Sequence, residues 1–252
     1  MCKVISIVNQ KGGCSKTTSA VNIGIGLANA GKKVVLIDAD AQGSLTASLG
    51  FQKPDELKVT LATIMAKTIN EEVIDLSKVI LHHEEGVDLV PGNIELSGLE
   101  VQLSNVLSRE LILKEFVDSL RDSYDYILID CAPSLGMMTI NALVAADEVI
   151  IPVQAAYLPV KGLQQLMKTI NMVKRRLNKK LQIDGILLAM VDYRTTFARN
   201  ISAELFAAYG ESVGIFENYI PSSIKAVEAS SAGISIYTNM IQKEKSLRHM
   251  QR

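Results

Sequence analysis

A short turn between an apolar run and a helical run constrains the fold of this chain more than any other feature of the sequence. The β-branched run Val4–Val8 predicts a buried strand, and the segment Thr17–Ala30 predicts a helix. Between them, Gly12 and Gly13 allow the backbone to bend around an anion without a Cβ in the way. Because the first N–H groups of a helix have no partner inside the helix, the turn predicts a phosphate-binding site.

The end of this turn supplies side chains that suit a nucleotide bound with a metal ion. Lys16 is expected to reach the outer phosphates, and the Thr17 hydroxyl is expected to be a ligand of Mg²⁺. The loop expected to surround the phosphates consists of Lys11, Gly12, Gly13, Cys14, Ser15, Lys16, Thr17 and Thr18. The alternative is an ordinary Gly-Gly turn with an incidental lysine. That alternative does not explain why the preceding strand, the following helix and the Lys-Thr pair all fit a phosphate-binding loop.

Three carboxylates follow two further apolar runs. Asp38 and Asp40 stand at the end of the run Val34–Ile37, and Asp130 ends the run Tyr126–Ile129. If these runs are parallel strands, their carboxyl ends meet at the edge of the sheet where ligands bind. There, one of the first two acids can lie near Mg²⁺ while the other orients the attacking water, and Asp130 can hold Mg²⁺ directly or through water. Acids that solvate a loop or cap a turn are the alternative for each.

Apolar runs alternate with helical patterns along the chain. This alternation predicts an α/β fold with a doubly wound, mostly parallel sheet flanked by helices, as one domain over residues 1–252. The expected strands are Val4–Val8, Val34–Ile37, Val87–Val90, Tyr126–Ile129, Val149–Val153, Ile186–Val191 and Val213–Phe216. The expected helices are Thr17–Ala30, Leu61–Ala66, Leu96–Leu107, Leu111–Ser123, Thr139–Ala145, Leu163–Leu177, Ala198–Ala208 and Ile241–Met250. The least regular stretch, residues 52–86, is expected at an edge, with residues 82–85 in an exposed polar loop.

Composition excludes several classes of protein. The apolar fraction of 48% and the charged fraction of 21% are those of an ordinary globular protein. The longest apolar run, Ile186–Val191, is far too short to span a bilayer, and no signal peptide is expected before the first strand. Cys2, Cys14 and Cys131 are far apart and form no C-x-x-C pair, which argues against a disulfide framework or a zinc site. A reducing cytoplasm is the expected location.

The net charge of −1 hides a difference between the two halves of the chain. Residues 1–126 contain 12 Lys/Arg and 17 Asp/Glu, a net charge of −5, whereas residues 127–252 contain 14 and 10, a net charge of +4. The segment Lys161–Lys180 carries basic residues and no acid. Such a distribution fits a polyanionic partner such as nucleic acid, and it fits equally a solvated helix face.

The phosphate loop resembles a known variant of the P-loop. The usual pattern G-x-x-x-x-G-K-S/T fails because Gln10 and Ser15 stand at its glycine positions, while K-G-G-x-x-K-S/T fits from Lys11 onward. This is similar to the deviant Walker A motif of the ParA/MinD family of ATPases. The resemblance implies a P-loop NTPase in which Lys11 reaches across a dimer interface to the other subunit's nucleotide. Residues 38–43 match the family motif D-x-D-x-Q-G. The resemblance implies that Asp40 is needed for hydrolysis and that Asp38 supports the Mg²⁺ site.

Further segments extend the resemblance over nearly the whole chain. Residues 130–143 resemble switch II of the family, and residues 151–154 and 162–163 resemble its P-x-q…eGl stretch. Residues 219–225 resemble the segment I-P-R-n-x-R/K near the adenine pocket, which implies that Pro221 packs on the base. In chromosomal, Soj-type ParA proteins, this segment and the D-x-R-T/N turn carry arginines that contact DNA, and Arg194 and Lys225 match them in charge. Ser222 stands where an arginine is often found, and ordinary surface charge remains the alternative for Arg194 and Lys225.

Two residues of the loop depart from the family pattern. Ser15 stands where glycine often precedes the Walker lysine, and we expect a near-helical backbone there that tolerates serine. Cys14 is expected to fill a variable position as a small residue, although the N-terminus of a helix also lowers the pKa of a thiol and would suit an oxidation sensor.

Taken together, the resemblance implies a cytoplasmic partitioning ATPase that associates with the nucleoid when ATP is bound. It would bind MgATP, form a homodimer, bind DNA non-specifically, and hydrolyse ATP slowly under stimulation by a ParB-type partner. A MinD-like membrane-associated regulator is the rival, but the tail Asn239–Arg252 has only a thin apolar face for a membrane. A relative that positions a protein cluster instead of DNA is a third possibility.

Overall fold

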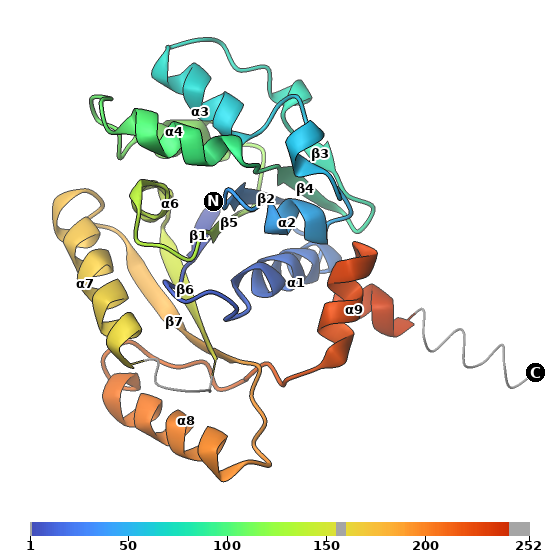
Figure 1. Cartoon of the computed structure of the whole chain (residues 1–252), viewed down its shortest axis with the longest axis vertical. Helices are drawn as coiled ribbons and strands as arrows, with labels where there is room; N and C mark the ends of the chain where they lie inside the picture. The colour runs from blue at the N-terminus through green and yellow to red at the C-terminus, as the bar shows by residue number, and fades with distance from the viewer. Residues whose placement is uncertain (1, 155–159, 242–252) are drawn as a thin grey trace, which may run out of the picture.

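A seven-stranded sheet forms the centre of the computed structural model, which describes residues 2–154 and 160–241 (Figure 1). The strand order is β3-β4-β2-β5-β1-β6-β7, and all neighbouring strands are parallel except β3 and β4. The strands are β1 (Lys3–Ile7), β2 (Val34–Ala39), β3 (Leu81–His82), β4 (Val87–Val90), β5 (Tyr126–Cys131), β6 (Glu148–Gln154) and β7 (Gln182–Ala189). The predicted α/β class with a mostly parallel sheet is confirmed.

Helices connect the strands and cover both faces of the sheet. They are α1 (Lys16–Asn29), α2 (Ser44–Ser48), α3 (Leu61–Ile69), α4 (Glu95–Leu103), α5 (Ile112–Leu120), α6 (Met137–Ala145), α7 (Val160–Arg176), α8 (Thr196–Tyr209) and α9 (Ile224–Ala232). Short 3₁₀ turns lie at η1 (Pro54–Glu56) and η2 (Leu76–Lys78), and residues 236–241 are helical. Within the described part of the chain, no helix combines the length and apolarity needed to cross a membrane.

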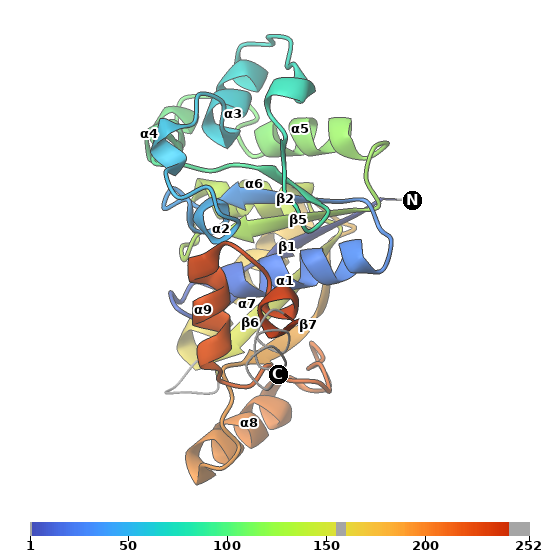
Figure 2. The same ribbon diagram turned by 90° about the vertical axis from the view of Figure 1, so that its right-hand side faces the viewer.

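The sheet is buried on both faces, which explains why its strands lack apolar–polar alternation. Ile5 and Ile7 pack with α1 and α2 in one core cluster, whereas Val4 and Val8 belong to a second, larger cluster with α3 to α7. Figure 2 shows α1 and α9 on one side of the sheet and α3, α4 and α5 on the other. All six residues of β2 are buried.

Some expected elements differ from the structure. The expected strand Val213–Phe216 is wrong: Ile215 makes only an isolated bridge to Ile186, because Gly214 has a positive φ of 85° that interrupts an extended chain. The expected helices at 96–107 and 111–123 end earlier, at Leu103 and Leu120. The expected helix Ile241–Met250 lies, apart from its first residue, outside the described residues.

The elements α2, β3 and α9 were not expected from the sequence. Helix α9 has no apolar stripe that would reveal it: its single fully buried residue is Ala229, while Ile224 and Val227 are 78% and 67% exposed. Strand β3 is only two residues long. Such elements are fixed by their neighbours in the fold and not by their own periodicity.

Residues 230–236, near the end of the described chain, form hydrogen bonds with α1, with α2 and with the loop after β3. Ser230 hydrogen-bonds Ser48 of α2 (2.8 Å between the hydroxyl oxygens), and Ile236 N–H donates to Asn22 Oδ1 of α1 (2.9 Å). Glu85 Oε1 accepts from Ser235 N–H (2.8 Å). In the loop after β3, His83 Nε2 also lies 3.1 Å from the Gly233 carbonyl oxygen. The expectation of a merely exposed polar loop at 82–85 is therefore wrong for its half-buried members, which bind this distant segment.

Candidate functional site

The loop between β1 and α1 has the open, concave backbone that the sequence predicts. Gly13 has φ +67°, and a Cβ added at Gly12 or Gly13 would meet no atom within 4 Å. The loop opens directly into α1, so the unpaired N–H groups of the first helical turn face it. An anion the size of a phosphate fits this arrangement of free space and backbone donors.

The side chain of Lys16 is held inside this loop. It is only 7% exposed, and Lys16 Nζ donates to the carbonyl oxygen of Lys11 at 3.2 Å. The buried thiol of Cys14 donates to the same oxygen at 3.1 Å. The Lys16 ammonium thus lies within the loop that the sequence assigns to the phosphates, and Cys14 fills space in the loop as a small buried residue. Burial raises the pKa of the Cys14 thiol, which argues against its role as an oxidation sensor.

Asn9 is a site residue that the sequence reasoning missed. Its side-chain amide donates to the Pro152 carbonyl of β6 at 2.7 Å, and its Oδ1 accepts from Lys11 N–H at 2.9 Å. It therefore fixes the start of the loop against a neighbouring strand. The sequence does contain a signal for this role, because an Asn side chain commonly accepts a hydrogen bond from the backbone N–H two residues later, and Asn9 stands two residues before Lys11.

Ser15 does not have the near-helical backbone expected for it. Its φ and ψ are 69° and 24°, in the left-handed region, and its side chain makes no capping hydrogen bond. The Ser15 carbonyl still accepts from Ser19 N–H at 2.8 Å, so the first helical hydrogen bond of α1 begins there. This conformation costs an L-residue about 1–2 kcal/mol.

Asp130 is placed beside the phosphate loop by the register of the sheet. It pairs with Ile7 of β1 and with Asp38 of β2, and its Oδ2 accepts from the Thr17 hydroxyl at 2.6 Å. Its other oxygen is buried with no hydrogen-bond partner among the described residues. Burial, reinforced by the charge of Asp38, raises the pKa of Asp130 to about 8 despite the Thr17 bond. A buried carboxylate with a free oxygen next to a hydroxyl suits a hard cation such as Mg²⁺.

Asp38 is buried next to Asp130 but is turned toward α2. Its Oδ2 accepts from the backbone N–H and the hydroxyl of Thr46 at 2.8 and 2.7 Å, and its Oδ1 accepts from Asp40 N–H at 3.3 Å. Burial raises the pKa of Asp38 to about 6, against the effect of these hydrogen bonds. The structure thus brings Asp38 and Asp130 together, while hydrogen bonds to protein already occupy both oxygens of Asp38.

Asp40 lies at the start of the loop that leads into α2. It is 9% exposed, and its Oδ1 accepts from Gln42 N–H at 3.0 Å. Over residues 2–154 and 160–241, no three His, Cys, Asp or Glu side chains gather closely enough to hold a metal ion alone. A Mg²⁺ ion at Thr17 and Asp130 would therefore take its remaining ligands from phosphate oxygens and water.

The residues expected near adenine and DNA lie on two adjacent segments beyond β7. Pro221 is exposed and bridges to Val191, which places the start of α9 next to the turn that carries Arg194. Arg194 is exposed but forms a two-point ion pair with Asp192, at 2.8 and 2.7 Å, which lowers the pKa of Asp192 to about 2. Lys225 is exposed and has no ion-pair partner among the described residues.

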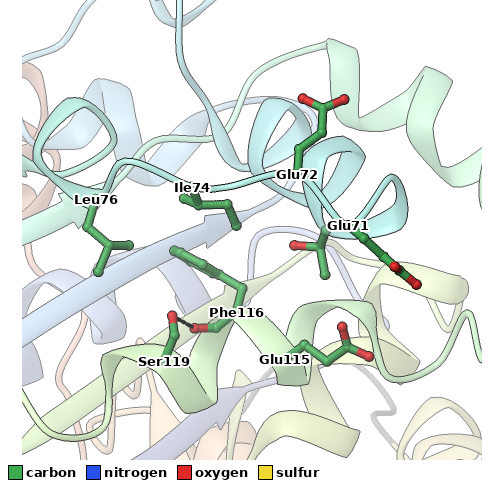
Figure 3. Close-up of a pocket in the computed structure, with 8 residues that line it drawn as sticks. Glu71, Glu72, Ile74, Leu76, Glu115, Phe116 and Ser119 are labelled. Carbon is green, nitrogen blue, oxygen red and sulfur yellow. Dashed lines mark hydrogen bonds between the residues drawn. The ribbon is translucent and has the colours of Figure 1, made fainter.

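A separate groove of about 480 Å³ lies between α3 and α5, on the other face of the sheet from α1 (Figure 3). Its apolar part is lined by Ile74, Leu76 and Phe116, and the rest is lined by three glutamates with Thr68 and Ser119. No lysine or arginine is among its described lining residues, so it lacks the cations that a phosphate site needs. The groove is therefore no candidate for the nucleotide.

Comparisons with known proteins agree with this geometry. The family described as AAA domain matches residues 2–183. The sporulation initiation inhibitor protein Soj of Bacillus subtilis is 41% identical over 233 residues, which are 92% of this chain and 89% of that protein. The chromosome partitioning protein ParA of Caulobacter vibrioides is 36% identical over 92% of this chain and 85% of its own length. The structure of cobyrinic acid a,c-diamide synthase from Mycobacterium smegmatis with bound ATP analog and magnesium has a TM-score of 0.82 at 33% identity, and covers 100% of this chain and 96% of that one.

Proposed function

The chain belongs to the ParA/MinD family of P-loop ATPases, which use ATP and Mg²⁺, and we propose that it is a DNA-partitioning ATPase. The observation that carries the proposal is the match to Soj and ParA proteins along nine-tenths of the chain. The loop with the additional lysine Lys11 lies within residues 2–183, which the family model matches. The proposed cycle has three parts: nucleotide binding, dimerisation and DNA association. Each is assigned below to residues of this chain.

Nucleotide binding is assigned to the loop from Lys11 to Thr18. Backbone N–H groups and the Lys16 ammonium would hold the phosphates, and the Thr17 hydroxyl and Asp130 would hold Mg²⁺. The metal, when bound, neutralises negative charge on the phosphates. Asp40, nearly buried at the end of β2, would orient the attacking water. Pro221 would pack on the adenine.

Dimerisation is assigned to Lys11. Its side chain is exposed at the start of the loop and has no ion-pair partner among the described residues, while Asn9 fixes its backbone. An exposed cation on a fixed backbone at the mouth of a phosphate site is suited to reach a nucleotide bound by a second copy of the chain. We assign Lys11 to this contact in an ATP-bound homodimer.

DNA association is assigned to Lys225 and Arg194, which lie on the two adjacent segments beyond β7. Lys225 is exposed at the start of α9 and has no ion-pair partner among the described residues. The exposed Lys174, Arg175 and Arg176 lie in the last turn of α7, at the opposite end of the strands, where Asn178 donates to the Ala146 carbonyl just before β6. Arg194 forms an ion pair with Asp192, so we expect its contribution to DNA affinity to be smaller than that of Lys225. A ParB-type partner would stimulate hydrolysis, and the protein would lie in the cytoplasm, on the nucleoid when ATP is bound.

Co-sedimentation with DNA or with anionic liposomes, in the presence of ATP, tests the proposal. We expect the protein to pellet with DNA of any sequence, with an affinity that falls as salt rises. Lys225→Ala should flatten the plot of log affinity against log salt by about one unit per monomer, or about two per dimer. Lys53→Ala, which removes a lysine paired with Glu56 elsewhere on the surface, is the matched control and should leave the slope unchanged.

Two outcomes would contradict the assignment. Pelleting with anionic liposomes but not with DNA would favour the MinD-like alternative. Absence of any ATP-dependent, salt-sensitive DNA association would remove the basis of a partitioning role. A protein cluster as cargo would leave the DNA result unchanged and would be recognised from the identity of the bound partner.

A further inference from the structure

Thr46, in the short helix α2, joins three segments beside the proposed active site. Its hydroxyl donates to Asp38 Oδ2 at 2.7 Å and accepts from Gly92 N–H at 3.0 Å, and its own N–H donates to the same Oδ2 at 2.8 Å. Thr46 is fully buried, and its hydroxyl is used as both donor and acceptor. These contacts connect the end of β2, the start of α2 and the turn after β4.

The backbone of Gly92 lies very close to Asp38. A Cβ at Gly92 would lie 2.4 Å from the Asp38 carbonyl oxygen, closer than any side chain permits. Gly92 therefore brings its N–H to Thr46 by lying directly against the backbone of Asp38. A carboxylate held by two donors from one residue and packed against a glycine keeps one orientation.

The other oxygen of Asp38 points to the residue proposed to orient water. Asp38 Oδ1 accepts from Asp40 N–H at 3.3 Å, and the turn that follows is closed by Gly43 N–H donating to the Asp40 carbonyl at 3.0 Å. The direction of the Asp40 side chain depends on this turn. The backbone position of Asp40 is thus fixed by Asp38, and the orientation of Asp38 is fixed by Thr46.

We propose that Thr46 is a positioning residue for Asp40 and acts through Asp38. The inference rests on the proposed role of Asp40 in hydrolysis. Without the hydroxyl, Asp38 Oδ2 keeps only the Thr46 N–H as a donor, and the buried Gly92 N–H loses its acceptor. The carboxylate can then turn about this single bond and release Asp40 N–H. The phosphate loop makes none of these contacts, so nucleotide binding is preserved.

The test compares Thr46→Val and Thr46→Ser in single-turnover ATP hydrolysis at saturating MgATP, together with ATP affinity. We expect Thr46→Val to lower the rate about tenfold or more, because small displacements of catalytic groups have effects of this size. ATP affinity should stay within about threefold, and Thr46→Ser, which retains the hydroxyl, should restore most of the rate. Thr46→Ala is measured in parallel because it removes the hydroxyl without placing a new methyl group next to Asp38.

The control and the second background separate positioning from a purely structural role. Thr68→Val removes a hydroxyl that bonds the Ile64 carbonyl in α3, and it should leave the rate unchanged. In the Asp40→Ala background, Thr46→Val should cause no further loss of rate, because both changes remove the same contribution.

Equal loss of rate in both backgrounds would overturn the inference, as would parallel loss of rate and ATP affinity. A normal rate for Asp40→Ala alone would instead show that the proposed role of Asp40 is wrong.

Discussion

Replacing Ser15 by glycine is expected to stabilise the nucleotide-free protein, because Ser15 has a left-handed backbone at φ 69°. For an L-residue this conformation costs about 1–2 kcal/mol, and glycine avoids most of that cost. Glycine in turn gives the unfolded chain more freedom, which opposes folding by about 0.4–1 kcal/mol. No hydrogen bond of the serine side chain is lost, since it makes no capping bond.

The difference between these effects is a gain of about 0.5–1 kcal/mol in the free energy of unfolding. For a chain of this length, it corresponds to a rise of about 1–4 °C in melting temperature. Urea denaturation of the nucleotide-free protein measures the free energy, and a thermal melt provides the second measurement. Both are made without ATP so that ligand binding adds nothing to stability.

Two other serines provide matched controls for the same chemical change. Ser108 also has a positive φ, of 52°, and Ser108→Gly should stabilise in the same direction although it lies outside the phosphate loop. Ser97 is exposed in α4, where φ is that of a right-handed helix, and Ser97→Gly should destabilise by about 0.5 kcal/mol. If Ser15→Gly lowers stability as Ser97→Gly does, the strain assigned to Ser15 is absent and the reasoning is refuted.

The remaining predictions concern the charged residues of the site. Lys16→Ala is expected to lose ATP binding, because the cation that pairs with phosphate is removed; unchanged affinity in calorimetry would contradict the P-loop assignment. Lys11→Ala should bind ATP as a monomer but neither dimerise productively nor hydrolyse ATP, and wild-type turnover would exclude its role in trans. Asp40→Ala should accumulate as an ATP-bound dimer in light scattering, and a mutant that stays monomeric when saturated with MgATP would contradict this. Asp130→Asn should raise the melting temperature of the nucleotide-free protein, and the gain should grow with pH. The reason is that the folded pKa of Asp130, about 8, lies above the ordinary aspartate pKa of 3.8, so rising pH between these values ionises the unfolded state first and favours unfolding; a gain that does not change with pH would show that the carboxyl is not kept neutral by burial.

The sequence predicted the parts of the fold that depend on local pattern. The runs that became β1, β2 and β5 are continuous and β-branched, and sheet topology alone places their carboxyl ends together. This is why the neighbourhood of Thr17 and Asp130 could be expected from two separate motifs. The structure shows that the two residues are neighbours, with the Thr17 hydroxyl 2.6 Å from Asp130 Oδ2. The register between β1 and β5, which pairs Ile7 with Asp130, brings them together.

The parts that escaped prediction depend on contacts between distant segments. The hydroxyl of Thr46 could have bonded many groups, and only the packing of α2 against the turn after β4 gives it Asp38 and Gly92. The left-handed φ of Ser15 could not be predicted from the residue type, because serine rarely adopts this conformation. His83 looked like part of a solvated loop because its partner, Gly233, is 150 residues away.

The hydrogen bonds between the C-terminal segment and the first helices also determine when folding can be completed. The contact of Ile236 with Asn22 spans 214 residues, and that of Ser230 with Ser48 spans 182. During synthesis at about 5–20 residues per second, α1 therefore remains without this cover for about 10–40 s after it emerges. Contacts of such long sequence separation form late and slow the folding of a domain. A ribosome-stalled chain that ends before Ser230 should leave the outer side of α1 and α2 open to proteases and chaperones.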